Sequence, residues 1–138
     1  MTAWTRDELS TIGAADEVQI ESLRDDGTLR RPVTIWVVRH GDDLYVRSVH
    51  GRDSTWFRGA QERLQGRIRA GGVVRDVGFV DAGEDLDEPL DTDYRTKYRR
   101  YARSIVDSIV STKARSATLR LVPRSVDEAP DRQEERRP

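Results

Sequence analysis

The residues best suited to bind a ligand are arginines, hydroxyl residues and a tryptophan in two short stretches of the sequence. Arg30 and Arg31 precede a predicted strand, and Arg47 ends the strand that follows it. Arginine donates paired hydrogen bonds to phosphate oxygens, and the free amides at the start of a helix favour an anion. The two stretches therefore predict an anion-binding site. Its candidate residues are Arg30, Arg31, Arg47, Ser48, Gly51, Arg52, Thr55 and Trp56.

A planar ring is the second chemical group that this region could hold. Trp56, or Trp36 one strand away, could flank such a ring, because aromatic side chains stack on flat groups. A purely structural interpretation is the alternative. In it, Arg47 pairs with an acid of residues 81–93, and both tryptophans fill the core.

Few side chains suit other catalytic chemistry. The histidines, His40 and His50, lack the close spacing of a metal pair and the chain has no cysteine, so no metal site is predicted. Ser48 lacks the surrounding Gly-x-Ser-x-Gly turn that would expose it as a nucleophile. The carboxylates of residues 84–88 are typical of a solvated acidic loop. No catalytic residue is assigned from the sequence.

Charge is segregated along the chain, although the net charge is only −1. Residues 29–80 and 94–123 carry net charges of +5 and +7, whereas residues 1–28 and 81–93 are acidic. A positive site on a protein that is neutral overall favours a small anionic ligand over long nucleic acid. Nucleic-acid binding is therefore the less favoured alternative. It would use Arg95, Arg99, Arg100 and Arg103.

Hydrophobic periodicity, capping residues and turn signals predict the elements that position these side chains. The predicted strands are residues 18–23, 33–38, 44–47, 67–70, 73–80 and 117–122, and the predicted helices are residues 5–13, 54–63 and 91–109. Hairpin connections dominate, which indicates an α+β antiparallel barrel or curved sheet flanked by helices rather than a parallel sheet.

Two details of the helices bear on the core. Gly66 is predicted to stop the second helix, and an acidic loop over residues 81–91 leads into the third. The third helix is the longest, and a stripe of apolar and aromatic residues should face the core. The stripe consists of Tyr94, Tyr98, Tyr101, Ile105 and Ile109.

The chain of 138 residues has the size of one domain, predicted over residues 1–123. Residues 124–138 carry nine charges in fifteen positions and are predicted to form a disordered tail. No apolar stretch long enough for a signal peptide or a membrane span is present, so a cytoplasmic location is expected.

Several strings of the sequence resemble one bacterial family. They are Ile35-Trp36-Val37-Val38-Arg39, Leu44-Tyr45-Val46-Arg47-Ser48 with Gly51 and Trp56, Asp93-Tyr94-Arg95 with Lys97-Tyr98, and Thr118-Leu119-Arg120-Leu121. On these strings the chain resembles the bacterial domain-of-unknown-function family 2255 over residues 4–123. More remotely, the order of elements is similar to the deazaflavin-dependent nitroreductases, which belong to the split β-barrel class that binds FMN or deazaflavin.

The remote resemblance implies a split β-barrel of about six antiparallel strands flanked by helices, with hydride transfer to a small electron-poor substrate. It also implies a homodimer. The segment 27–32 resembles the part of that class that helps to hold the cofactor phosphates, and segment 46–58 resembles its strand, glycine loop and tryptophan helix. The asparagine that follows the tryptophan in the class is missing, because residues 57–60 differ. The alternative is a non-catalytic module of the same fold that binds an anionic metabolite or a partner protein.

Overall fold

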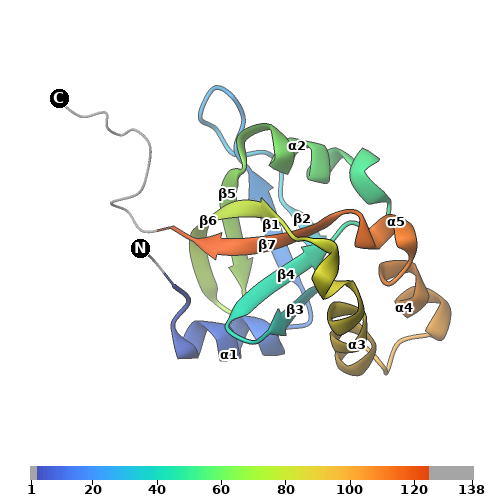
Figure 1. Cartoon of the computed structure of the whole chain (residues 1–138). Helices are drawn as coiled ribbons and strands as arrows, with labels where there is room; N and C mark the ends of the chain where they lie inside the picture. Colours follow the sequence, from blue (N-terminus) through green and yellow to red (C-terminus); the bar gives the residue numbers. More distant parts are fainter. Residues whose placement is uncertain (1–2, 125–138) are drawn as a thin grey trace.

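Seven strands form one antiparallel sheet that curls into a nearly closed barrel flanked by helices (Figure 1). The structure is a computed structural model, and it describes residues 3–124. The sheet order is β2-β1-β5-β6-β7-β4-β3. The strands are β1 (Val18–Ser22), β2 (Val33–Ile35), β3 (Val37–His40), β4 (Asp43–Arg47), β5 (Gln65–Ala70), β6 (Val73–Asp81) and β7 (Thr118–Pro123). The predicted α+β barrel is confirmed, with one strand more than expected.

The additional strand arises at Trp36, which divides the predicted strand 33–38. β2 pairs with β1, whereas β3 pairs with β4. The two strands at the ends of the sheet order are therefore separated in sequence by Trp36 alone. We call this crossing point the seam of the barrel. Periodicity does not reveal it, because the residues on both sides of Trp36 are β-branched and apolar.

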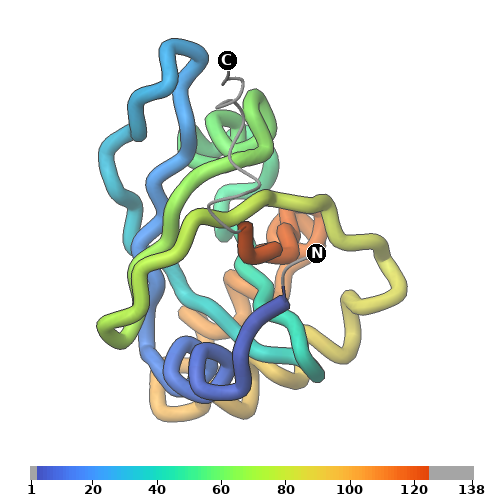
Figure 2. Tube along the Cα trace, turned by 90° about the vertical axis from the view of Figure 1, so that its left-hand side faces the viewer, coloured from blue at the N-terminus to red at the C-terminus, as the bar shows by residue number. Residues whose placement is uncertain are grey.

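Helices α1 (Arg6–Ala14) and α2 (Thr55–Arg63) lie at opposite ends of the barrel (Figures 1 and 2). A reciprocal capping box starts α1: the Glu8 amide donates to Thr5 Oγ1 at 3.0 Å, and the Thr5 amide donates to Glu8 Oε1 at 2.9 Å. Ser54 starts α2, because its hydroxyl accepts a hydrogen bond from the Phe57 amide. Both predicted helix starts are confirmed.

The predicted role of Gly66 as a helix stop is wrong. Helix α2 ends instead at Leu64, which has the left-handed backbone of a C-terminal cap, with φ at 58°. Gly66 lies within β5, where a Cβ atom would sit 2.4 Å from the carbonyl oxygen of Glu21 on β1. The glycine is required by the close approach of two strands.

Residues 84–116 leave the sheet between β6 and β7 and form a helical arm beside β3 and β4 (Figure 1). The arm consists of η2 (Glu84–Leu86), α3 (Asp87–Lys97), α4 (Arg103–Ile109) and α5 (Thr112–Arg115). The predicted acidic loop is thus wrong over its second half, since acids of that segment occupy the first turn of α3. Negative charge is favourable at that end of a helix.

The predicted long helix is also broken, by a turn after Lys97. Tyr94 and Tyr98 are buried as expected, but the break rotates α4 relative to α3. As a result Val106 is buried and Ile105, predicted to face the core, is 49% exposed.

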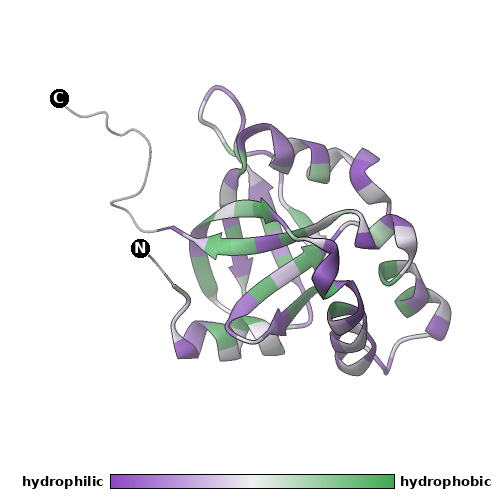
Figure 3. Ribbon diagram, in the orientation of Figure 1, coloured by the Kyte–Doolittle hydropathy of each residue, from purple (hydrophilic) through white to green (hydrophobic). Residues whose placement is uncertain are grey.

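Buried apolar residues gather in two separate cores. Those inside the barrel, the barrel core, include Ile20, Ile68, Val77, Phe79, Leu119 and Leu121. Those between the outside of β3 and β4 and the arm, the outer cluster, are Val38, Tyr45, Leu90, Tyr94, Tyr98, Val106 and Ile109. Figure 3 shows hydrophobic residues along β4, where Leu44 and Val46 belong to the barrel core and Tyr45 between them belongs to the outer cluster.

No helix within residues 3–124 is long and apolar enough to cross a membrane. The predicted tail lies outside the described residues from position 125 onward.

Candidate functional site

Two pockets adjoin at Trp56, which lines both of them. The cationic pocket has a volume of about 270 Å³ and is lined by Ser22, Arg24, Arg30, Arg31, Thr55 and Trp56, with further residues of β1 and β2. The apolar pocket has a volume of about 200 Å³ and is lined mainly by Ile35, Trp36, Val49, Trp56, Ile105 and Ile109. One pocket therefore offers positive charge and the other offers aromatic and aliphatic surface.

The hairpin between β1 and β2 positions the arginines of the cationic pocket. The Arg30 amide donates to the Ser22 carbonyl at 2.8 Å, and the Thr28 amide donates to Asp26 Oδ1 at 3.0 Å within the turn. Arg24 closes the hairpin by donating to the Thr28 hydroxyl at 3.2 Å. Arg24 was not among the predicted site residues, although it directly precedes Asp25-Asp26-Gly27, a sequence typical of a turn.

Arg30 lies against α2, where Gly59 leaves room for it. A Cβ atom at Gly59 would be 2.8 Å from Arg30 Nε and 2.9 Å from the Ser22 hydroxyl. Arg30 Nη2 donates to Glu62 Oε1 at 2.7 Å, but its buried Nε has no hydrogen-bond partner within residues 3–124. Leaving a buried donor unpaired is costly, so an acceptor supplied by a ligand would stabilise this position.

Arg31 and the start of α2 complete the cationic pocket. Arg31 is exposed and has no ion pair or side-chain hydrogen bond in the described part of the chain. The amides of Thr55 and Trp56 lie in the first turn of α2, where no preceding helical carbonyl is available to them. An anion in this pocket would meet a free guanidinium and the positive end of a helix.

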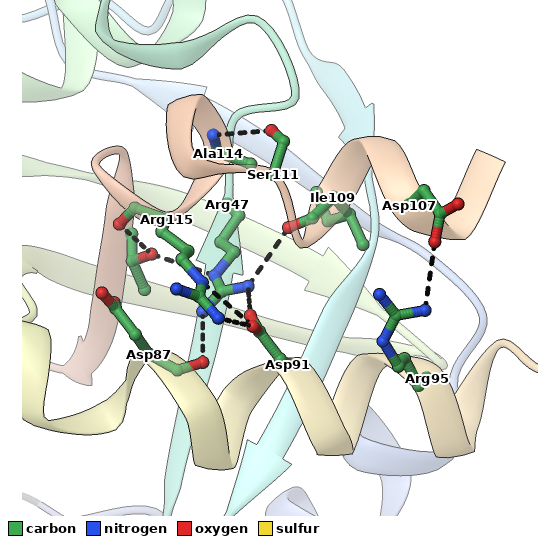
Figure 4. Close-up of polar contacts among 10 residues, drawn as sticks. Arg47, Asp87, Asp91, Arg95, Asp107, Ile109, Ser111, Ala114 and Arg115 are labelled. Atoms are coloured by element: carbon green, nitrogen blue, oxygen red, sulfur yellow. Dashed lines mark hydrogen bonds and ion pairs between the residues drawn. The ribbon is translucent and has the colours of Figure 1, made fainter. Parts of the chain in front are cut away.

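The structure corrects the predicted role of Arg47 as a phosphate ligand. Its side chain is 0% exposed, and its donors are already bound (Figure 4). Nη1 donates to Asp91 Oδ1 at 2.5 Å and to the Ile109 carbonyl at 3.1 Å, Nη2 donates to the Asp87 carbonyl, and Nε donates to the Thr118 hydroxyl. Arg47 borders the apolar pocket, but its charge is paired with an acid of residues 81–93, as the structural interpretation required.

Three other predicted residues lie away from the cationic pocket. The Ser48 hydroxyl is buried and donates to Ser54 Oγ at 2.8 Å, so it supports the cap of α2. Gly51 has φ at 77° and packs against α5, where a side chain would collide. Arg52 donates to the Ser116 carbonyl at 2.7 Å on another side of the molecule. Of the eight predicted residues, the structure brings Arg30, Arg31, Thr55 and Trp56 together.

Two exposed apolar side chains lie at the apolar pocket. Val49 is 40% exposed and Ile105 is 49% exposed, and both line the pocket. Water around such groups is released when an apolar ligand covers them. Neither residue was predicted to line a site, because Ile105 was expected to face the core and Val49 was assigned no role.

The seam fixes the aromatic wall of the apolar pocket. Trp36 stacks on Tyr98 with ring centroids 3.8 Å apart and an interplanar angle of 1°. The Val37 amide donates to the Tyr98 hydroxyl at 3.1 Å, and Lys97 Nζ donates to the Val37 carbonyl at 2.6 Å. Burial raises the pKa of Tyr98 and lowers the pKa of Lys97 to about 8. The hydroxyl is therefore neutral, and the Tyr98 ring together with the bonds to Val37 holds Trp36 in place.

Asp91 connects two arginines through its two carboxylate oxygens. Oδ1 pairs with Arg47, while Oδ2 accepts a hydrogen bond from Arg115 Nε at 2.9 Å and also contacts Arg115 Nη2. Burial alone would raise the pKa of Asp91, but the hydrogen bonds from Arg115 and Arg47 outweigh it and the pKa is lowered. Asp91 is accordingly charged at neutral pH.

The histidines lie apart from both pockets. His40 Nδ1 is 2.8 Å from Asp93 Oδ2, and His50 lies in the turn after β4. Over residues 3–124 no three His, Asp or Glu side chains are grouped as metal ligands would be.

Solved structures with a similar fold were found at low sequence identity. A conserved hypothetical protein from Mycobacterium tuberculosis aligns with a TM-score of 0.63 and 11% identity, over 88% of this chain and 82% of that one. An F420 reductase aligns with a TM-score of 0.54 and 11% identity, over 84% and 92%. A FAD-binding protein from Mesorhizobium loti aligns with a TM-score of 0.53 and 12% identity, over 90% and 93%. At these identities the likeness shows the fold.

No curated protein sequence matches the chain at a significant level. One family profile does match, over residues 8–121, and its description is "Uncharacterized protein conserved in bacteria (DUF2255)". This is the family that the strings around Trp36, Arg47, Tyr98 and Arg120 resemble. Since the match spans most of the barrel and the whole arm, the chain belongs to domain-of-unknown-function family 2255.

Proposed function

We propose that the protein binds a flavin-type cofactor, either FMN or a deazaflavin. The observation that carries the proposal is the pair of adjoining pockets that meet at Trp56, one cationic and one apolar. A phosphorylated cofactor with a flat ring needs these two environments side by side. Two of the solved structures with this fold are named an F420 reductase and a FAD-binding protein, which supports a cofactor of this class.

The residues present fit such a group. Arg31 and the unpaired Nε of Arg30 would donate to phosphate oxygens, together with the amides at the start of α2. Trp36 and Trp56 would flank the ring, and Ile105 at the pocket edge would exclude water.

A flavin-type cofactor supplies hydride chemistry when bound, so the protein itself needs few acid or base groups. In this proposal the chain is an oxidoreductase that acts on a small electron-poor substrate. Its own residues bind the phosphate, orient the ring and shield it from water. The proposal includes a homodimer located in the cytoplasm.

Titration of the full chain with FMN and with a deazaflavin cofactor, followed by cofactor fluorescence, tests the proposal. A charge-assisted contact contributes about 1.5 to 3 kcal/mol, so Arg31→Ala should weaken binding about ten- to a hundredfold. Arg120→Ala is the matched control. Arg120 also carries a partly exposed guanidinium, but it lies on β7 and pairs with Asp43 at 3.9 Å.

Two outcomes would contradict the proposal. Failure of the wild-type protein to bind either cofactor at about 100 µM would remove the flavin function and favour a non-catalytic module for another anionic metabolite or a partner protein. Binding that is weakened equally by Arg31→Ala and Arg120→Ala would show that the phosphate does not occupy the cationic pocket.

A further inference from the structure

One wall of the apolar pocket belongs to the helical arm. Ile105, Ser108 and Ile109, all from α4, line the pocket together with Thr34 and Ile35 of β2. Helix α4 has only seven residues and buries only Val106 and Ile109. So short a helix depends on contacts with the rest of the molecule for its position. The shape of the pocket therefore depends on what holds α4 in place.

The end of α4 is held by Arg47 (Figure 4). Arg47 Nη1 donates both to the Ile109 carbonyl, at 3.1 Å, and to Asp91 Oδ1, at 2.5 Å. Asp91 is 13% exposed, and its other oxygen pairs with Arg115 of α5. One carboxylate thus orients the guanidinium that reaches from β4 to α4.

A second ion pair on the same helices provides a contrast. Arg95 on α3 donates to Asp107 on α4 at 3.1 Å, and both side chains are 52% exposed (Figure 4). Exposed pairs contribute little, because water and salt screen them. Of the two arginines, Arg47 therefore makes the stronger contact with α4, because it is buried when it donates to the Ile109 carbonyl, while the exposed pair adds little.

We propose that Asp91 is a positioning residue for the ring of the bound ligand. It acts through Arg47, which sets the place of α4 and thereby the distance between the Ile105 wall and the Trp36 wall of the apolar pocket. The cationic pocket is built from β1, β2 and α2, so it does not depend on Asp91. This inference rests on the proposed function, because it concerns the ring that the proposed cofactor would place in the apolar pocket.

Riboflavin and inorganic phosphate separate the two pockets experimentally. Riboflavin carries the ring without a phosphate, and phosphate competition against FMN reports on the cationic pocket alone. Asp91→Asn should weaken riboflavin binding about tenfold, since a loosened supporting contact displaces the wall of a site. It should leave the phosphate competition constant within about twofold, and the control Asp107→Asn should leave both within about twofold.

Asp91→Asn leaves a buried guanidinium without its counter-charge, so circular dichroism must first show that the variant folds. Arg115→Gln is the second variant, because it loosens Asp91 but keeps the pair with Arg47. It should weaken riboflavin binding about threefold and leave the phosphate constant unchanged, since its pair is partly exposed. This variant decides the question if Asp91→Asn is unfolded.

Three results would overturn the inference. Unchanged riboflavin binding in a folded Asp91→Asn or Arg115→Gln protein would reject the role of Asp91 while the proposed function stands. Equal losses for riboflavin and phosphate would show general damage rather than positioning. Absence of riboflavin, FMN and deazaflavin binding in the wild-type protein would reject the proposed function, and the inference with it.

Discussion

The barrel core and the outer cluster use opposite faces of the same strands and bury their residues in different ways. Val37 and Val46 point into the barrel, where aliphatic side chains and phenylalanines pack without a buried charge. Val38 and Tyr45 point outward, where the cluster contains tyrosines and borders the buried Arg47. Packing is the main source of stability inside, whereas outside the hydrogen bonds of polar groups must also be satisfied.

The difference matters for the proposed site. The cationic pocket is attached to the barrel, while the apolar pocket has one wall on the arm that the outer cluster supports. Changes in the outer cluster should therefore affect stability through polar groups and pH, and changes in the barrel core should act through volume alone.

The largest effect is expected in the barrel core. Phe79→Ala should lower the free energy of unfolding by about 4 kcal/mol, because a fully buried aromatic ring is replaced by a cavity. The loss should be the same at acidic and at mildly alkaline pH, since the barrel core contains no titratable group. Urea unfolding at several pH values measures this. A pH-dependent loss would show that the two cores are coupled.

A smaller effect is expected from one hydroxyl of the outer cluster. Tyr98→Phe should lower the free energy of unfolding by about 2 kcal/mol, because the Val37 amide loses its acceptor while the ring remains. Tyr45→Phe is the control, since its hydroxyl makes no hydrogen bond in the described part of the chain and its loss should cost less than about 0.5 kcal/mol. If urea unfolding showed the same loss of free energy for Tyr98→Phe and Tyr45→Phe, the bond between Tyr98 and Val37 at the seam would not contribute to stability.

The smallest expected effect is a change of the free energy of unfolding with pH, caused by the titration of Lys97. Its pKa is lowered to about 8 in the folded protein, against an ordinary value of 10.5. Between these values the unfolded chain binds more protons, so stability should rise as the pH increases from about 8 towards 10. Since Lys97 is only partly buried, the rise should be about 1 kcal/mol. Lys97→Met should remove this rise in urea unfolding, and Lys113→Met, the other lysine of the chain, should retain it.

Much of the fold follows from local patterns in the sequence. The capping box of Thr5 and Glu8, the Ser54 cap and the glycine hairpin between β5 and β6 are short-range signals, and all are present. The division of strand 33–38 was not predictable in this way, because Trp36 separates strands whose partners lie elsewhere in the chain. The break of the third predicted helix after Lys97 was not predictable either, because the stripe of tyrosines keeps its helical spacing through the break.

The candidate site shows the same division. Neighbouring residues predict the hairpin and the helix start that carry Arg30, Arg31, Thr55 and Trp56, and these four residues do come together. The partner of Arg47 is 44 positions away in sequence, and nothing local distinguishes Asp91 from the other acids of its segment. Arg47 was predicted to bind phosphate, and only the alternative interpretation paired it with an acid of residues 81–93, so the tertiary structure was needed to identify Asp91 as its partner.

The seam at Trp36 also affects how the protein avoids aggregation through the edges of its sheet. The outermost strands of an open sheet expose unpaired amides and carbonyls, which recruit strands from other chains. Here the two outermost strands are β2, which has three residues, and β3, and a single residue tethers them to each other. The tether keeps both edges at one place, where Tyr98 and Lys97 already bond the backbone of Val37. A chain cut at this point would release two edges at once, and such a protein should aggregate through edge-to-edge strand pairing.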